Sequence, residues 1–221
     1  MYIILYKCYP NNGGELIMYT LFIYNNESNR LERYNLQPYS NIPYITHSSM
    51  SVSDFFSNTS SCAGWTSTEF IRKWNKFSRG KIHAEFIFRR IWEGGYISES
   101  MHYAGLAADT SSDTFPDTFP FSTQNHVSLS PWGYPDISFG DIGLFVLVMQ
   151  DALSALGFTE GELDGFFGPR TLSALTRFRH LHGLQERNIC DRETWRVLTF
   201  HACGCGVTPC CKYVFKHKTI L

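Results

Sequence analysis

The stretch VLVMQDALSALGFTEGELDGFFGPRTLSALTRFRHLHGL, from Val146 to Leu184, carries the clearest structural pattern in the chain. Apolar residues recur in it with helical spacing in two runs, and each run ends at a glycine that can take the left-handed conformation of a helix C-terminus. The first run is Val146, Met149, Leu153 and Leu156 before Gly157, and the second is Leu172, Leu175, Phe178 and Leu181 before Gly183. The pattern predicts two amphipathic helices.

The residues around these runs predict where helices begin. Pro169 suits the first position of the second helix, because its missing amide hydrogen has no partner there in any case. Downstream, Asp191 is placed to cap a short third helix that carries Trp195 and Leu198. Three short helices within about 60 residues predict a compact bundle, and this spacing alone indicates no function.

The same stretch closely resembles the three-helix peptidoglycan-binding domain over residues 140 to 199. The resemblance rests on Q-x-x-L-x-x-L-G at Gln150, Leu153, Leu156 and Gly157, on D-G-x-F-G-x-x-T at Asp164, Gly165, Phe167, Gly168 and Thr171, and on Thr194-Trp195. It implies that the partner is peptidoglycan, through its glycan strands and stem peptides. We place this domain at residues 139–200.

The chain departs from that family at Arg179 and in the turn before the last helix, where residues 187–191 read RNICD in place of the family's second D-G-x-x-G. Arg179 stands where the family usually has glutamine, which puts affinity for wall glycans in question. Asn188 and Asp191 fill positions usually held by glycine, and both residue types tolerate left-handed backbone better than most. We therefore expect the fold to be kept.

A second motif lies upstream, in SESMHYAGLAADT from Ser98 to Thr110. His102 and Asp109 can be read as ordinary polar residues around a turn of small residues. The spacing S-x-H-x-x-G-x-A-x-D, however, resembles the metal-binding signature of zinc D-Ala-D-Ala carboxypeptidases. The resemblance implies that His102 and Asp109 bind Zn²⁺ and that a later histidine, for which His126 is best placed, completes the set. Three such ligands leave one position open for the water that attacks an amide.

Further residues have roles in this hypothesis. Arg90 is a candidate for gripping the terminal carboxylate of a stem peptide, because a guanidinium matches that anion in a bidentate way; a solvated arginine at a strand end is the alternative. Ser100 is a candidate for orienting a ligand or the turn. The segment from Ser122 to Ser128 contains no acid to act as base. Two functions therefore stay open: a zinc-dependent D,D-carboxypeptidase, or a non-catalytic peptidoglycan-binding protein with a degenerate peptidase domain.

The rest of the chain predicts an α+β fold. We expect a hairpin over residues 18–34, a surface segment over 35–64, a helix over 67–77 and a strand over 82–92. The peptidase-like domain then covers residues 18–110, with a possible extension to about 128, after an N-terminal extension at 1–17. A Pro/Ser-rich linker follows at 111–138 with the tandem repeat DTFPDTFP, and a cysteine-rich tail covers 201–221.

Composition excludes several classes of partner. The formal net charge of -1 gives a phosphate backbone little reason to bind, so we expect no nucleic acid. The apolar run Tyr2 to Tyr6 is far shorter than the ~20 residues that span a bilayer, and we expect no membrane span and find no clear signal peptide. A monomer in the cell wall, outside the cell or on a spore is the expectation. The tail HACGCGVTPCC offers a weaker alternative zinc site.

Overall fold

The computed structural model describes residues 18–46, 50–56, 59, 61–78, 88–94, 99–107, 133–158 and 162–202. They fall into two compact units that alternate along the chain. The sheet unit takes the described residues between 18 and 89 and between 102 and 107, and the bundle unit takes those between 90 and 101 and between 133 and 202. The chain is thus mixed α and β, as predicted.

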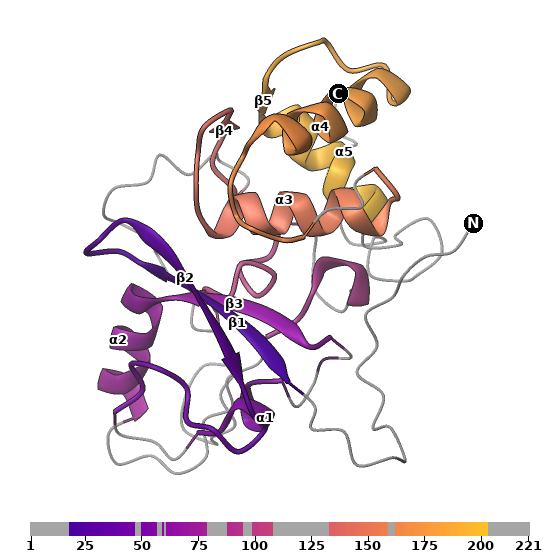
Figure 1. Ribbon diagram of the computed structural model, residues 1–221. Helices are drawn as coiled ribbons and strands as arrows, with labels where there is room; N and C mark the ends of the chain where they lie inside the picture. Colours follow the sequence, from indigo (N-terminus) through magenta and orange to yellow (C-terminus); the bar gives the residue numbers. More distant parts are fainter. Residues whose placement is uncertain are drawn as a thin grey trace, which may run out of the picture. The chain divides into compact units, whose positions relative to one another are not determined.

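The sheet unit is built on the predicted hairpin. Strand β1 (Tyr19–Asn25) pairs antiparallel with β2 (Arg30–Leu36), from Tyr19 opposite Leu36 to Asn25 opposite Arg30. At seven residues each, they are the longest strands in the part of the chain that the structure describes (Figure 1). Asn25 holds the turn, because its side-chain oxygen accepts hydrogen bonds from the backbone amides at positions 27 and 28. The hairpin predicted over residues 18–34 is confirmed.

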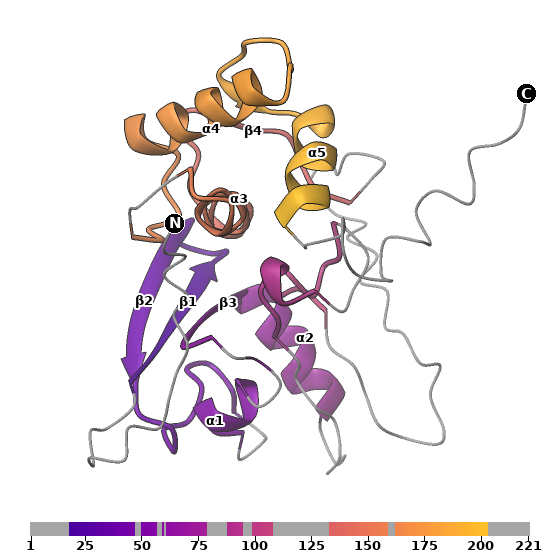
Figure 2. The ribbon, with the colours of Figure 1, turned by 90° about the vertical axis from the view of Figure 1, so that its right-hand side faces the viewer.

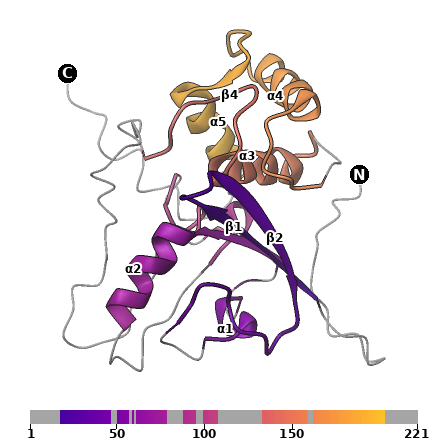
Figure 3. The ribbon, with the colours of Figure 1, turned by 60° about the vertical axis from the view of Figure 1, so that its left-hand side comes forward.

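A third strand and a helix complete the sheet unit. Strand β3 (Ala63–Ser67) pairs in parallel with β1, which gives the order β2-β1-β3. Helix α2 (Thr68–Ser78) follows directly and contacts β1 and β3, as Figure 3 shows. Ser67 caps it, because the Ser67 hydroxyl accepts the amide of Phe70 at 3.0 Å. The predicted helix is confirmed, whereas β3 carries no strong alternation that would predict it.

The segment 35–64 is not merely a surface covering, as we expected from its polar composition. It contains helix α1 (Val52–Phe55), which Ser51 begins with a capping box that includes Asp54. Ile42, Val52 and Phe55 are at most 2% exposed and form part of the core. Because these apolar residues are separated by irregular backbone, they show no periodicity in the sequence.

The strand predicted over 82–92 is wrong at its C-terminal end, and residues 82–87 lie outside the described residues. Ile91–Glu93 form a 3₁₀ turn, η1, in the bundle unit. The Glu93 carboxylate accepts the backbone amide of Arg90 at 2.8 Å, and Gly94 follows with a φ of 65°. The hydrogen bond between the Glu93 side chain and the Arg90 amide stabilises a local turn, and this turn competes with the extended strand that the aromatic residues favour.

The bundle unit contains the three predicted helices: α3 (Leu144–Ala155), α4 (Pro169–Leu181) and α5 (Arg192–Ala202). Figure 2 looks along α3, with α4 and α5 beside it. Two short strands, β4 (Ile137–Ser138) and β5 (Ile189–Cys190), pair antiparallel beside them. Pro169 is at the first turn of α4 and Asp191 precedes α5, as predicted.

None of the described helices is long and apolar enough to cross a bilayer.

The turn before α5 differs from its expected geometry. Among the described residues other than glycine, only Asn29, Tyr44 and Glu99 have a positive φ, so Asn188 and Asp191 do not take the left-handed conformation. The turn closes instead through side chains, since Asp191 accepts the Thr194 amide at 3.0 Å. A side-chain hydrogen bond thus stabilises this turn, in place of the left-handed backbone that glycine would allow.

Candidate functional site

A buried glutamine organises the turn between α3 and α4. Gln150, on α3, is 5% exposed, and its Nε2 donates to Asp164 Oδ1 at 2.6 Å, to the Phe166 carbonyl at 3.1 Å and to Thr171 Oγ1 at 3.0 Å. Its Oε1 accepts the amide of Gly165 at 2.9 Å. One side chain therefore bonds to polar groups of Asp164, Gly165, Phe166 and Thr171 in the D-G-x-F-G-x-x-T turn, which only a group that both donates and accepts can do.

A pocket of about 230 Å³ opens beside this turn. Its floor is buried and consists of Gln150, Leu153, Thr171 and Ala174, from α3 and α4. Its rim is exposed and charged, with Glu162 and Asp164 from the turn and Arg170 from the first turn of α4. The pocket therefore has a buried floor of mixed polar and apolar residues and charges of both signs at its rim.

An apolar patch lies on the loops that flank the same turn. Phe139, Ile142 and Phe166 are 51%, 52% and 41% exposed. Ile142 and Phe166 are joined by an antiparallel backbone bridge, so their loops lie side by side. A methyl group on Gly168 would lie 2.8 Å from the Phe166 ring, so the lack of a side chain at Gly168 lets this ring pack over the backbone.

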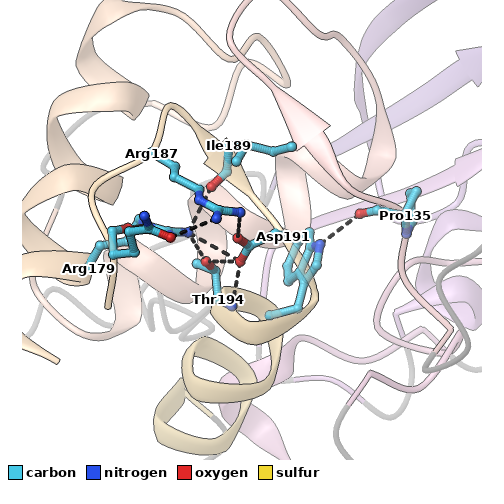
Figure 4. A network of polar contacts seen from close by, with 8 residues as sticks. Pro135, Arg179, Arg187, Ile189, Asp191 and Thr194 are labelled. Carbon is cyan, nitrogen blue, oxygen red and sulfur yellow. Dashed lines mark hydrogen bonds and ion pairs between the residues drawn. The ribbon is translucent and has the colours of Figure 1, made fainter. Parts of the chain in front are cut away.

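The next turn, between α4 and α5, is organised by Arg179. This residue is 1% exposed, and its Nε donates to the Gln185 carbonyl at 2.8 Å. One terminal nitrogen donates to the Ile189 carbonyl at 3.0 Å and also contacts Asp191 and the Thr194 hydroxyl (Figure 4). Arg179 is therefore a buried structural residue of the bundle, in a position that no ligand could reach without unfolding the turn.

Asp191 is the anionic centre of this network. Its Oδ1 accepts the Thr194 hydroxyl at 2.6 Å and lies 3.3 Å from Arg179. Burial raises the pKa of the Asp191 carboxyl, but hydrogen bonds from Thr194 and Arg179 outweigh burial and hold that pKa below its usual value. The carboxylate stays ionised near neutral pH. The Trp195 indole, on the same helix as Thr194, donates to the Pro135 carbonyl at 2.8 Å.

Arg90 and Ser100, predicted to contact substrate or ligand, both belong to the bundle unit. Arg90 is 4% exposed, and its Nε donates to Asp151 Oδ1 on α3 at 2.8 Å. A terminal nitrogen of Arg90 makes a second contact with the same oxygen. The Ser100 carbonyl accepts the Tyr134 hydroxyl at 2.8 Å. The structure thus gives Arg90 an internal carboxylate partner, and its contact with a substrate carboxylate stays a prediction.

His102, the predicted first zinc ligand, belongs to the sheet unit and lies in a closely packed turn. Both nitrogens of its ring are buried. The carbonyl of Tyr103 accepts the Trp65 indole at 2.8 Å, and the carbonyl of Gly105 accepts the Thr66 hydroxyl at 2.8 Å. These bonds hold Tyr103 and Gly105 against β3.

Asp109 and His126 lie outside the described residues, so the structure does not bring the three predicted ligands together or separate them. Within the described part of the chain, no three histidine, cysteine, aspartate or glutamate side chains converge as a metal site would require. The zinc site therefore stays a prediction.

Sequence reasoning missed Glu162 and Arg170 as site residues. Neither carries a strong signal alone, because charged residues beside a turn are usually solvated. Their positions flanking the D-G-x-F-G motif were the available signal: the motif fixes a turn, and residues on either side of a fixed turn share one rim.

Comparison with known proteins agrees with this geometry. Residues 143–198 match the family described as a putative peptidoglycan binding domain. A curated protein of Kitasatospora aureofaciens, named "Uncharacterized protein in bpoA1 3'region", is 34% identical over 76 residues, which are 34% of this chain and 64% of that protein. The chain thus spans less than two thirds of that relative's length. No solved structure matches the chain. The family match supports the predicted peptidoglycan-binding domain, at residues 143–198 of this chain.

Proposed function

We propose that this protein binds peptidoglycan through the pocket beside the α3–α4 turn. The observation that carries the proposal is the position of the pocket: it is lined by Gln150, Asp164 and Thr171, within the residues that match the peptidoglycan-binding family. The network of Gln150 holds the floor in place before any ligand binds. A pocket formed in advance loses little conformational entropy on binding.

The apolar patch of Phe139, Ile142 and Phe166 supports the same proposal. Sugar rings carry apolar faces that pack on aromatic side chains, and such half-exposed aromatics beside a polar pocket suit a polymer that is both sugar and peptide. Because the patch and the pocket share the Asp164–Phe166 turn, one ligand can reach both.

Co-sedimentation with insoluble peptidoglycan sacculi tests the proposal. The full chain should pellet with sacculi and stay in solution with chitin, an insoluble glycan without stem peptides. Reversing the rim charge with Arg170→Glu should weaken binding, while the exposed Arg187→Glu, at the other turn of the bundle, should have little effect. Circular dichroism checks that both variants fold. Equal recovery with sacculi and chitin, or none with either, would reject peptidoglycan as the ligand.

A second proposal is that the chain also contains a zinc-dependent D,D-peptidase site formed by His102, Asp109 and His126. The observation that favours it is the fixed turn around His102, with both ring nitrogens buried and Gly105 packed on the β3 backbone. Imidazole and carboxylate ligands suit Zn²⁺, which would supply an activated water and polarise the scissile carbonyl. Arg90 and Ser100 keep their proposed substrate and orienting roles only in this version.

Zinc content per chain tests this second proposal independently of activity. The parent should hold about one zinc, and His102→Ala, Asp109→Ala and His126→Ala should each hold much less. His180→Ala, an exposed histidine on α4, is the matched control. If the parent holds no zinc after loading, the degenerate, non-catalytic alternative stands. If zinc is held, release of D-alanine from a stem peptide decides between a catalytic and a relic site.

A further inference from the structure

We infer that His182 and His201 form a binding site for one divalent transition-metal ion, such as Zn²⁺, at the end of the bundle unit where helices α4 and α5 terminate. This site shares no residue with the pocket beside the α3–α4 turn or with the proposed zinc-peptidase ligands. The inference therefore does not rest on either function proposed above.

The two imidazole rings lie in contact although they belong to different helices. His182 is the C-cap residue of α4, and His201 lies in the last turn of α5. Their ring centres are 4.4 Å apart, and the ring planes are tilted by 39°. Metal–nitrogen bonds of about 2.0–2.1 Å place the centres of two imidazole rings that share one ion roughly 4.5–5 Å apart. The pair therefore needs little movement to share an ion.

The backbone at the end of α4 holds His182 in this position. The His182 amide donates to the Phe178 carbonyl at 3.1 Å, and the Leu184 amide donates to the Arg179 carbonyl at 2.9 Å. Gly183 has a φ of 66°, which lets the chain turn directly after the helix. The rings of Phe178 and His182 also lie 4.4 Å apart. A ligand fixed in this way loses little conformational entropy when it binds an ion.

Both imidazoles are available to an ion. His201 is exposed and His182 is half-buried. In the part of the chain that the structure describes, no hydrogen-bond or ion-pair partner occupies either ring. No third histidine, cysteine, aspartate or glutamate among the described residues joins them in a metal-binding group. The inferred site therefore has two protein ligands, and water completes the coordination of the ion.

The electrostatics at this end of the bundle favour a cation. The C-terminal end of a helix carries a partial negative charge, and both histidines lie at such an end. Two protonated imidazoles in contact would repel each other; burial, and then the neighbouring His201, lowers the pKa of His182. One ion shared by two neutral imidazoles supplies positive charge without this repulsion, and imidazole nitrogen suits Zn²⁺, Cu²⁺ or Ni²⁺.

Packing of aromatic rings is the alternative explanation for the pair. His182 contacts the Phe178 ring, and His201 contacts the Phe200 ring with the ring centres 5.2 Å apart. Phenylalanine at either histidine position keeps an aromatic ring and removes the nitrogen ligands. His182→Phe and His201→Phe therefore separate metal binding from ring packing.

NMR spectroscopy of the histidine rings in the full chain tests the inference, with Zn²⁺ alone as the probe. The ring signals of His182 and His201 should shift together and saturate. His182→Phe should weaken the zinc response of His201 at least tenfold, and His201→Phe should do the same to His182. His180→Phe, at an exposed position of α4, is the matched control and should leave both responses unchanged. Mg²⁺ prefers oxygen ligands and should produce no shift.

The outcomes distinguish this site from the proposed peptidase site and from zinc bound elsewhere in the chain. A response of both rings that persists in His102→Ala supports a separate site in the bundle unit. If neither ring responds to Zn²⁺, or if each ring responds equally well when the other is phenylalanine, the pair is an aromatic contact and the inference is wrong. Circular dichroism checks that the variants fold, and the measurement on the parent protein does not depend on them.

Discussion

Gln150 and Arg179 occupy equivalent positions in two successive helix–turn–helix units. Gln150 reaches from α3 to the Phe166 carbonyl at 3.1 Å and to the Thr171 hydroxyl near the start of α4. Arg179 reaches from α4 to the Ile189 carbonyl at 3.0 Å and to the Thr194 hydroxyl near the start of α5. Each also contacts an aspartate of its turn. The bundle is therefore an internal repeat, in which one buried polar side chain per turn binds the next helix.

Replacing Gln150 with leucine should destabilise the bundle unit strongly. The shape is roughly kept, but the Gly165 amide and the Thr171 hydroxyl lose their shared partner in a buried setting. Unsatisfied buried polar groups of this kind cost about 1–3 kcal/mol each, so we expect a loss of about 3 kcal/mol or more in the free energy of unfolding. Urea denaturation followed by tryptophan fluorescence measures it.

Gln185→Leu is the control for that experiment, because the Gln185 side chain is exposed and bonds only to Arg187 among the described contacts. It should change the free energy of unfolding by less than about 0.5 kcal/mol. A Gln150→Leu protein as stable as this control would show that the turn does not depend on the amide.

Arg179 should tolerate glutamine better than methionine. Methionine would leave Asp191 and the Ile189 carbonyl without the donor that they share, and removal of one partner from a buried ion pair costs about 3–5 kcal/mol. Glutamine keeps a donor for Thr194 and Asp191, as Gln150 does for the equivalent groups. Urea midpoints should rank parent above Arg179→Gln above Arg179→Met.

Sacculus binding should be unchanged in any Arg179 variant that still folds, because this residue is buried in the second turn and does not line the pocket. The substitution of arginine for the family's glutamine therefore changes how the turn is held together and not what the pocket binds. A folded Arg179→Gln protein with altered affinity for sacculi would contradict this separation.

The periodic part of the sequence predicted the structure best. Apolar stripes and caps identified α3, α4 and α5, because each helix buries one face and that face repeats in the sequence. The networks of Gln150 and Arg179 were not predictable in the same way, since their partners are backbone carbonyls and turn residues distant in sequence. Arg90 shows the same limit: a guanidinium at a predicted strand end indicated a substrate carboxylate, whereas tertiary packing pairs it with Asp151.

The peptidase motif was predicted from spacing, and spacing does not show where chains converge. Gly105 has a structural role that does not depend on a metal ion. The structure gives Gly105 a φ of 65° and packs it on the backbone of β3. Whether the three predicted zinc ligands meet depends on the path of the chain around Asp109 and His126.

Gly105→Ala should disrupt the sheet unit. An added Cβ would lie 1.8 Å from the Trp65 carbonyl oxygen, which is backbone in the middle of β3 and cannot move aside. The positive φ adds strain of roughly 1 kcal/mol, and the collision adds several more, so we expect a loss of at least about 3 kcal/mol or failure to fold. Thermal unfolding followed by circular dichroism measures it.

Gly183→Ala is the matched control for this substitution. Gly183 has almost the same φ, 66°, but nothing lies within 4 Å of its added Cβ. It should therefore cost only the conformational strain, about 1 kcal/mol. If Gly105→Ala and Gly183→Ala lost equal stability, backbone strain alone would explain why the S-x-H-x-x-G motif requires glycine. Close packing on the β3 backbone would then play no part in that requirement.

Glu99 should make the stability of the bundle unit depend on pH. Burial raises the pKa of its carboxyl to about 7, although Arg192 and Arg196 on α5 oppose the rise. In the unfolded chain the pKa is about 4.5, so between these values the folded state binds a proton that the unfolded state does not. The stability that Glu99 contributes is therefore fully present below about pH 4.5 and is lost as the pH rises to about 7. Replacement by glutamine, which mimics the protonated form, should remove this dependence.

Melting temperatures of the parent and of Glu99→Gln at about pH 5 and pH 8 test this prediction. Glu99→Gln should melt close to the parent at the lower pH and above it at the higher pH, where the parent carries a buried carboxylate. Glu193→Gln, which changes an exposed carboxylate in the first turn of α5, controls for the general effect of removing a negative charge. If Glu99→Gln and Glu193→Gln gain equally at the higher pH, the effect comes from net charge, and burial of Glu99 does not contribute.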